Sequence, residues 1–289
     1  MRAILGKFYS YYLKVEIIPS LSFKRQGLDQ VRKRWETDDA TVSKIRLSEG
    51  YRVESYRKLV EEIANVTLWN KEYEMFYRGQ TTDYKDKNGK SVIYPTICRP
   101  GKKEGGDYKA SIRQEEVKQR YQVLNDLIDF YDRRRNKLDE YYYSLFQHYE
   151  VHTTPFIDIT QSIRTAATFA LRGCDIGYLY VFGLPYPNGS ISHYIDSEIV
   201  LVKLQNVSPS DAFRPRYQEG YLVGKLPIKA NKTGSDNLAR RMIAKFLLDN
   251  TSGKFWDDNF PKLPEEVIFP TDDLYAKELS NVKTKFESK

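Results

Sequence analysis

The chain has 289 residues, of which 40% are hydrophobic and 14% aromatic, enough for one large domain or two small ones. Lys and Arg total 46 against 39 Asp and Glu, and the resulting formal charge of +7 permits an anionic partner without requiring one. The only cysteines, Cys98 and Cys174, are far apart, which excludes a disulfide framework and suits a reducing cytoplasm. No apolar stretch reaches about 20 residues, so we expect no transmembrane helix.

The first part of the chain predicts an N-terminal arm, then a helix and a strand. Residues 1–50 carry charges of both signs, and we expect them to pack on, or extend from, a main domain over residues 51–289. Between residues 53 and 66, apolar side chains recur at helical spacing and predict an amphipathic helix. The stretch YEMFYRG then predicts a short strand that ends at Gly79.

The middle of the chain predicts a helical layer. Apolar residues between 111 and 147 step by three and four, which is typical of one buried helix face. This stripe consists of Val117, Tyr121, Leu124, Ile128 and Tyr131. We expect the helical structure to end at His148 and a short strand, FIDI, to follow at residues 156–159. A second, alanine-rich helix should then begin with a cap near Thr160 or Ser162.

The last part of the chain is richer in strands. IGYLYVFGL, EIVLVKL and GYLVGKL are β-rich runs separated by Gly, Pro and Asn. Residues 237–250, NLARRMIAKFLLDN, carry apolar residues at helical spacing and predict a final helix. Because helices dominate the middle and strands cluster late, we expect an α+β fold with a mixed, mainly antiparallel sheet and a helical layer. The lack of a glycine-rich phosphate loop argues against a Rossmann or P-loop nucleotide site.

Five stretches occur together in an order that is informative. They are FYRGQ (76–80), YPTICRP (94–100), QHYEVHTTPFIDITQSIRTAATFA (147–170), RPRYQEGYLV (214–223) and IFPTDDLYAKEL (268–279). This series resembles the FRG domain family, named for a Phe-Arg-Gly motif whose local version is Tyr77-Arg78-Gly79. Glu150 stands where the family pattern has Gly, and Thr153 stands where it has Pro. The resemblance covers residues 55–280.

A second resemblance concerns the order of polar residues. ADP-ribosyltransferases have an Arg at a strand end, a Ser/Thr-rich strand before an Ala-Phe helix, and then a Glu or Gln-x-Glu element. Here Arg78, the segment from Thr153-Thr154 to Thr160, and the pair Gln218-Glu219 follow in that order. The resemblance implies an ADP-ribosyltransferase-like fold that uses NAD as its substrate. It further implies a toxin or phage-defence effector that either hydrolyses NAD or modifies a protein or nucleic acid.

The implied chemistry gives roles to particular residues. Loss of nicotinamide from NAD develops a cationic ribose, which a carboxylate stabilises. Glu219 is the first candidate for that role, and Gln218 and His148 are the other catalytic candidates. The expected nucleotide-binding residues are Tyr77, Arg78, Gly79, Thr154, Asp158 and Thr160. We expect Arg78, His148, Asp158 and Thr160 to converge in one cleft, and we expect no metal.

Several of these residues also have structural interpretations. Arg78 could form a buried ion pair, with Asp158 as its partner. His148 could order the segment around Asp158 by hydrogen bonding, and Thr160 could be a helix cap.

Gln218 and Glu219 leave a further alternative open. Gln218 could bond to the backbone, and Glu219 could be a solvated strand residue. Strand alternation would place the two side chains on opposite faces, so that only one could point into a cleft. If these structural interpretations hold, the chain is a non-catalytic module that binds a nucleotide, RNA or a protein.

Overall fold

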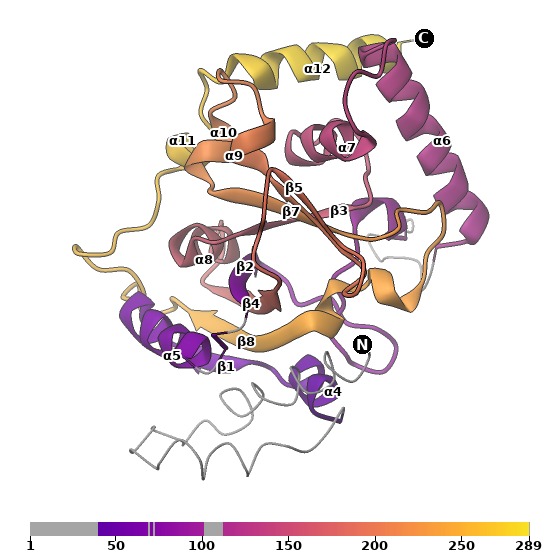
Figure 1. Ribbon diagram of the computed structural model, residues 1–289. Coiled ribbons are helices and arrows are strands. Elements are labelled where there is room, and N and C mark those ends of the chain that lie inside the picture. The colour runs from indigo at the N-terminus through magenta and orange to yellow at the C-terminus, as the bar shows by residue number, and fades with distance from the viewer. Residues whose placement is uncertain (1–39, 69, 72, 101–111, 289) are drawn as a thin grey trace. The chain divides into compact units, whose positions relative to one another are not determined.

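A computed structural model describes residues 40–68, 70–71, 73–100 and 112–288 (Figure 1). Most of the expected N-terminal arm, residues 1–39, lies outside this part of the chain. The chain divides into two compact units, each assembled from three segments. The first unit takes in the described residues up to Ile93, then Thr160–Tyr186 and Leu238–Leu263. The second unit takes in Tyr94–Ile159, Pro187–Asn237 and Pro264–Lys289.

The first unit contains four neighbouring strands. Their order is β1 (Tyr51–Val53), β8 (Met242–Asp249), β4 (Ile176–Leu184) and β2 (Glu74–Gln80). β1 is parallel to β8, whereas β8, β4 and β2 are antiparallel. Helices α5 (Tyr56–Leu68) and α8 (Ile163–Ala170) bury their apolar sides with these strands in one cluster. α4 (Ala40–Leu47) and the 3-10 helix η3 (Leu238–Arg241) also belong to this unit.

The second unit has its own strands and most of the helices. Its strand order is β3 (Phe156–Thr160), β7 (Gly220–Lys225), β6 (Ile199–Lys203) and β5 (Ile191–Tyr194), with β7, β6 and β5 antiparallel. The last residue of β3, Thr160, falls in the first unit. The helices are η1 (Thr96–Cys98), α6 (Gln114–Tyr131), α7 (Asp139–His148), α9 (Leu204–Val207), α10 (Arg214–Tyr217), η2 (Gly234–Asp236), α11 (Glu265–Ile268) and α12 (Leu274–Glu287).

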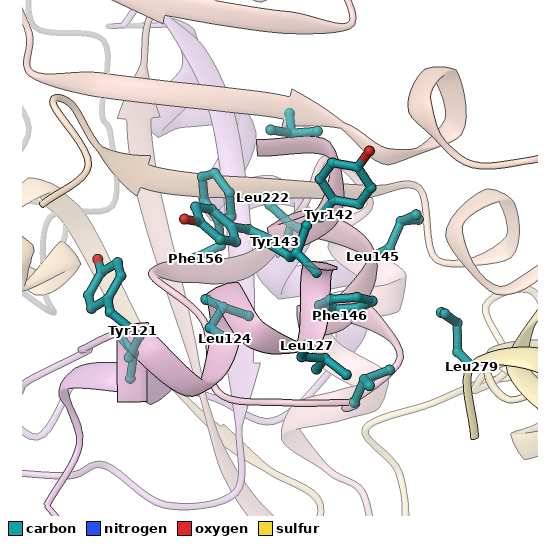
Figure 2. Close-up of a cluster of buried hydrophobic side chains, with 14 of the residues drawn as sticks. Tyr121, Leu124, Leu127, Tyr142, Tyr143, Leu145, Phe146, Phe156, Leu222 and Leu279 are labelled. Atoms are coloured by element: carbon teal, nitrogen blue, oxygen red, sulfur yellow. The ribbon is translucent and has the colours of Figure 1, made fainter. Parts of the chain in front are cut away.

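The core of the second unit confirms the predicted helical layer. Val117, Tyr121, Leu124 and Ile128 of α6 are all buried. They form a cluster with apolar side chains of α7 and with residues of β3 and β7, including Phe156 and Leu222 (Figure 2). The predicted stripe therefore faces the strands of this unit. Between the two helices, the charged segment 132–138 interrupts the helical structure.

The predicted final helix over residues 237–250 is wrong. This segment forms η3 and then β8. β8 lies between β1 and β4, and seven of its eight residues are buried, so apolar residues occur on both faces of the strand. A strand buried on both faces loses the alternation of period two, and its apolar run cannot be told from a helix by spacing alone.

The predicted fold class is confirmed. The described strands form mixed, mostly antiparallel sheet, and the helices are not interleaved with parallel strands in the manner of a doubly wound fold. Among the described helices, none combines the length and the apolar character that crossing a bilayer requires. The ADP-ribosyltransferase-like form of the fold stays a prediction.

Candidate functional site

The predicted site residues are divided between the two units. Tyr77, Arg78, Gly79 and Thr160 belong to the first unit. Thr154, Asp158, His148, Gln218 and Glu219 belong to the second. The expected convergence of Arg78 and Thr160 with His148 and Asp158 stays a prediction, and the two groups are described separately.

In the first unit, the Tyr77-Arg78-Gly79 motif lies at the end of β2. β2 pairs with β4 so that Arg78 is opposite Tyr180 and Gly79 is opposite Leu179. Tyr77 is buried with the side chains of α8, and it pairs with Thr160 of β3. Since side chains alternate along a strand, Arg78 lies on the opposite face from Tyr77 and shares a face with Tyr180.

Gly79 is required by the close packing of α8 on β2. A Cβ atom at Gly79 would lie 1.8 Å from the carbonyl oxygen of Ala166 and 2.7 Å from the amide nitrogen of Ala170. On the neighbouring strand, a Cβ atom at Gly177 would lie 2.0 Å from the carbonyl oxygen of Ala170. The alanine-rich helix α8 therefore meets two glycines, and the helix backbone packs directly on the strand backbone.

A hollow of about 520 Å³ lies beside Gly79, and we call it the Gly79 hollow. The end of β2 and the loop after it supply one wall, and the end of α8 supplies the other. The lining residues are Gly79, Gln80, Thr81, Thr82, Tyr84, Phe169, Arg172 and Gly173. Together they offer a guanidinium group, three hydroxyl groups, an amide and two aromatic rings, which suits a ligand with an anionic group and a planar base.

Thr160 is buried and forms a hydrogen bond just before the start of α8. Its hydroxyl oxygen accepts a hydrogen bond from the amide of Ser162 at 3.0 Å. Ser162 is the N-cap residue, and its own hydroxyl oxygen accepts from the amide of Thr165 at 3.3 Å. The predicted cap near Thr160 or Ser162 is therefore confirmed at Ser162.

In the second unit, Gln147 and His148 both hold Asp158. The amide of Gln147 donates to Oδ2 of Asp158 at 2.8 Å, and Nδ1 of His148 lies 3.2 Å from Oδ1. The side-chain oxygen of Gln147 in turn accepts from the hydroxyl groups of Thr96 and Thr154, at 3.0 Å and 2.7 Å. One network thus connects two predicted nucleotide-binding residues, Thr154 and Asp158, with His148.

The imidazole of His148 lies in the interior of the second unit. Its side chain is buried, and this loss of solvation lowers its pKa, although the hydrogen bond to Asp158 acts in the opposite direction. With Nδ1–H donating to Asp158, Nε2 is an acceptor that is buried and has no hydrogen-bond partner among the described residues. Gly220 lies beside the ring, since a Cβ atom there would be 3.5 Å from Cε1 of His148.

Gln218 and Glu219 precede β7 and do not lie in it, so the expected strand alternation does not apply to them. Gln218 is buried, and its amide donates to the carbonyl oxygen of Ile268 at 2.8 Å. Glu219 is exposed and has a φ of 48°, in the left-handed region that few residues other than glycine, Asn and Asp adopt. The side chain of Gln218 therefore connects the end of α10 to the end of α11.

A residue that the sequence did not single out, Asp273, connects three of the five stretches. It is buried, and its Oδ2 accepts from the amide of Arg214 at 2.9 Å and from the hydroxyl group of Tyr149 at 3.0 Å. Its Oδ1 caps α12 by accepting from the amide of Ala276 at 3.0 Å. Much of what makes these stretches distinctive therefore serves the structure of the second unit.

The remaining lining residues of the Gly79 hollow were also missed. The available signals were the two threonines after Gln80 and the Arg172-Gly173 pair after the alanine-rich helix. Neither pair forms a motif that could be read without the structure. Among the described residues, no group of three or more His, Cys, Asp and Glu side chains could hold a metal ion. No protein-family model, curated protein or solved structure matches the chain.

Proposed function

We propose that this chain binds a nucleotide in the Gly79 hollow. The observation that carries the proposal is the set of residues that line this hollow. One part of the lining, from Gly79 to Tyr84, begins at the last residue of the Tyr77-Arg78-Gly79 motif. Arg172 supplies a fork of donors for phosphate oxygens, and the hydroxyl groups of Thr81 and Thr82 add neutral donors. Tyr84 and Phe169 supply rings on which a base stacks.

NAD is the nucleotide that the resemblance to ADP-ribosyltransferases favours, and nicotinamide release is the reaction. The bond between C1′ of the ribose and the nicotinamide nitrogen breaks, and nicotinamide leaves with the bonding electrons. Water, or a side chain or base of a macromolecular target, forms the new bond to C1′ and loses a proton. The resemblance gives the role of stabilising the cationic ribose to Glu219, an exposed residue of the second unit, and we propose this role for Glu219 separately from the binding site in the first unit.

The backbone at Glu150 supports the underlying resemblance to FRG domains. Glu150 has a φ of 56°, and it stands where the family pattern has glycine. Glycine adopts this conformation without strain. The backbone at position 150 is therefore the one that the glycine of the family pattern would favour, although this chain has Glu there. On this basis we propose that the chain is an FRG-type effector, in defence or toxicity, that acts on NAD.

One observation favours a non-catalytic module instead. Two of the three catalytic candidates are used inside the second unit, because Gln218 bonds to Ile268 and the free nitrogen of His148 is buried. In that case the hollow binds a nucleotide as a signal, and no nicotinamide is released.

Two measurements test the proposal. Calorimetric titration with NAD and ADP reports binding, and chromatography reports free nicotinamide, with and without a cell lysate as a source of targets. Arg172→Ala should weaken binding by about 1–3 kcal/mol, the contribution of a charged hydrogen bond. Arg133→Ala, at an exposed arginine of the second unit, is the matched control and should bind as the parent does. If neither nucleotide binds the parent, the proposal is wrong.

A further inference from the structure

The loop that forms one wall of the Gly79 hollow contains a buried carboxylate. Thr82 and Tyr84 line the hollow and are exposed, but the side chain of Asp83 between them is only 3% exposed. A charged side chain in the interior is unfavourable unless it is paired and hydrogen-bonded. Asp83 therefore has partners that fix the backbone on either side of it.

Those partners lie on the two central strands of the first unit. Nζ of Lys245, in β8, donates to Oδ2 of Asp83 at 2.7 Å, and the hydroxyl group of Tyr180, in β4, donates to Oδ1 at 2.9 Å. Lys245 is fully buried, and it also donates to the hydroxyl oxygen of Ser91 at 3.0 Å and to the carbonyl oxygen of Ser48. Each of the three ammonium protons thus has an acceptor.

Stability alone gives a poor account of this arrangement. A buried ion pair contributes little net stability relative to apolar residues of similar volume, whereas its geometry is highly specific. The pair joins the sheet to the loop at a residue whose two neighbours, Thr82 and Tyr84, both line the hollow. The loop is further tied by the amide of Val92, which donates to the carbonyl oxygen of Tyr84 at 2.7 Å.

We propose that Asp83 is a positioning residue for the nucleotide, held by Lys245 and Tyr180. The ion pair keeps Thr81, Thr82 and Tyr84 in place before the ligand arrives, so binding does not have to order the loop. This inference rests on the proposed nucleotide site. It assigns the affinity of that site to a charge pair that never touches the ligand.

The test removes the pair without leaving a buried charge. The double variant Asp83→Asn/Lys245→Met is compared with Lys58→Met/Glu62→Gln, which removes an ion pair of 2.7 Å from α5 in the same unit. Tyr180→Phe removes a single donor to Asp83 and guards against a double variant that does not fold. Hydrogen exchange of the amides of residues 81–85, the melting temperature, and the Kd for ADP and NAD are measured for each protein.

We expect the 81–85 amides to exchange at least ten times faster in the double variant, with a melting temperature close to that of the control. The Kd should rise about tenfold, equivalent to about 1.4 kcal/mol, and Tyr180→Phe should show smaller changes of the same kind. If the loop amides of both variants exchange as in the parent, the inference is wrong. If the parent binds no nucleotide, the proposed function is wrong, and the exchange data alone decide whether Asp83 positions the loop. If the loop loosens and the Kd is unchanged, the role in binding is refuted.

Discussion

Nδ1 of His148 lies 3.2 Å from Oδ1 of Asp158, so a buried imidazole at the end of α7 is held by a carboxylate of β3. Asp158 is also held by Gln147 through its other oxygen, which fixes both partners of the histidine pair. The pair has a consequence for stability that can be measured without knowledge of any ligand.

We predict that the protein loses stability as the pH falls below about 6.5, the usual pKa of histidine. Burial lowers the pKa of His148 in the folded state, so the unfolded chain binds the proton more readily. The contribution of His148 to the free energy of unfolding is therefore complete above pH 6.5. It is lost as the pH falls towards the lower pKa of the folded state. Urea unfolding of the parent and of His148→Asn, which keeps a donor for Asp158, should show a flatter pH dependence in the variant. His152, whose pKa burial also lowers, leaves part of the slope in place.

Asn136→Ala provides the control for this experiment. Asn136 is exposed, lies in the same unit and has no titratable group. The variant should keep the slope of the parent between pH 7 and pH 5. A parent whose unfolding free energy is constant over that range would contradict the prediction.

Glu219→Gln should reduce the rate of nicotinamide release by about a hundredfold to a thousandfold, because it removes the charge that stabilises the cationic ribose. The Kd for NAD should change little. Gln218→Ala should act differently, since it leaves the carbonyl oxygen of Ile268 without its donor and lowers stability by about 1–3 kcal/mol. Single-turnover assays and thermal melts of both variants separate the two roles. Normal turnover by Glu219→Gln would rule out the assignment.

Gly79→Ala and Gly177→Ala should each destabilise the protein by about 1–3 kcal/mol or more, because the new methyl group meets backbone atoms of α8 that cannot move aside cheaply. Gly189→Ala is the control, since the nearest atom to its added Cβ would be 3.8 Å away. Chemical unfolding of the three variants measures the difference. Equal stability of Gly79→Ala and Gly189→Ala would show that α8 does not pack as closely as described.

Glu150→Gly should leave the protein as stable as the parent or increase its stability by up to about 1 kcal/mol, because glycine relieves the left-handed backbone at this position. The ion pair with Arg214 that is lost involves a glutamate side chain that is 77% exposed, so it contributes little. Glu61→Gly, in the interior of α5, is the opposite case and should destabilise by about 1 kcal/mol. Thermal melts would contradict this account if both substitutions lowered stability equally.

The sequence was most informative where periodicity reflects one buried face. The stripe of α6 was predicted because that helix buries one side, and α8 was predicted from its cap and its alanine-rich composition. β8 was predicted as a helix because it is buried on both sides, and Lys245 in the middle of its apolar run was the only local sign of something unusual.

Predictions about the site succeeded where neighbours in the sequence are also partners. His148 was expected to order the segment around Asp158, and this hydrogen bond is confirmed over ten residues of chain. Asp83 and Lys245 are 162 residues apart, and Arg214 and Asp273 are 59 apart. Nothing in a single sequence pairs such residues, because their contacts depend on how distant segments meet.

The alternation of the three segments of each unit has a consequence for synthesis. A ribosome releases the chain from its N-terminus, yet the first unit needs residues up to Leu263 and the second needs the C-terminal helix α12. β8, which has β1 and β4 on its two sides, is the last of the described strands in chain order, so β1 and β4 are both synthesised before their common neighbour, β1 long before it. Neither unit can be expressed alone as one continuous fragment of the gene, because each is assembled from three segments. A fragment with one complete unit would require those three segments to be joined by new linkers.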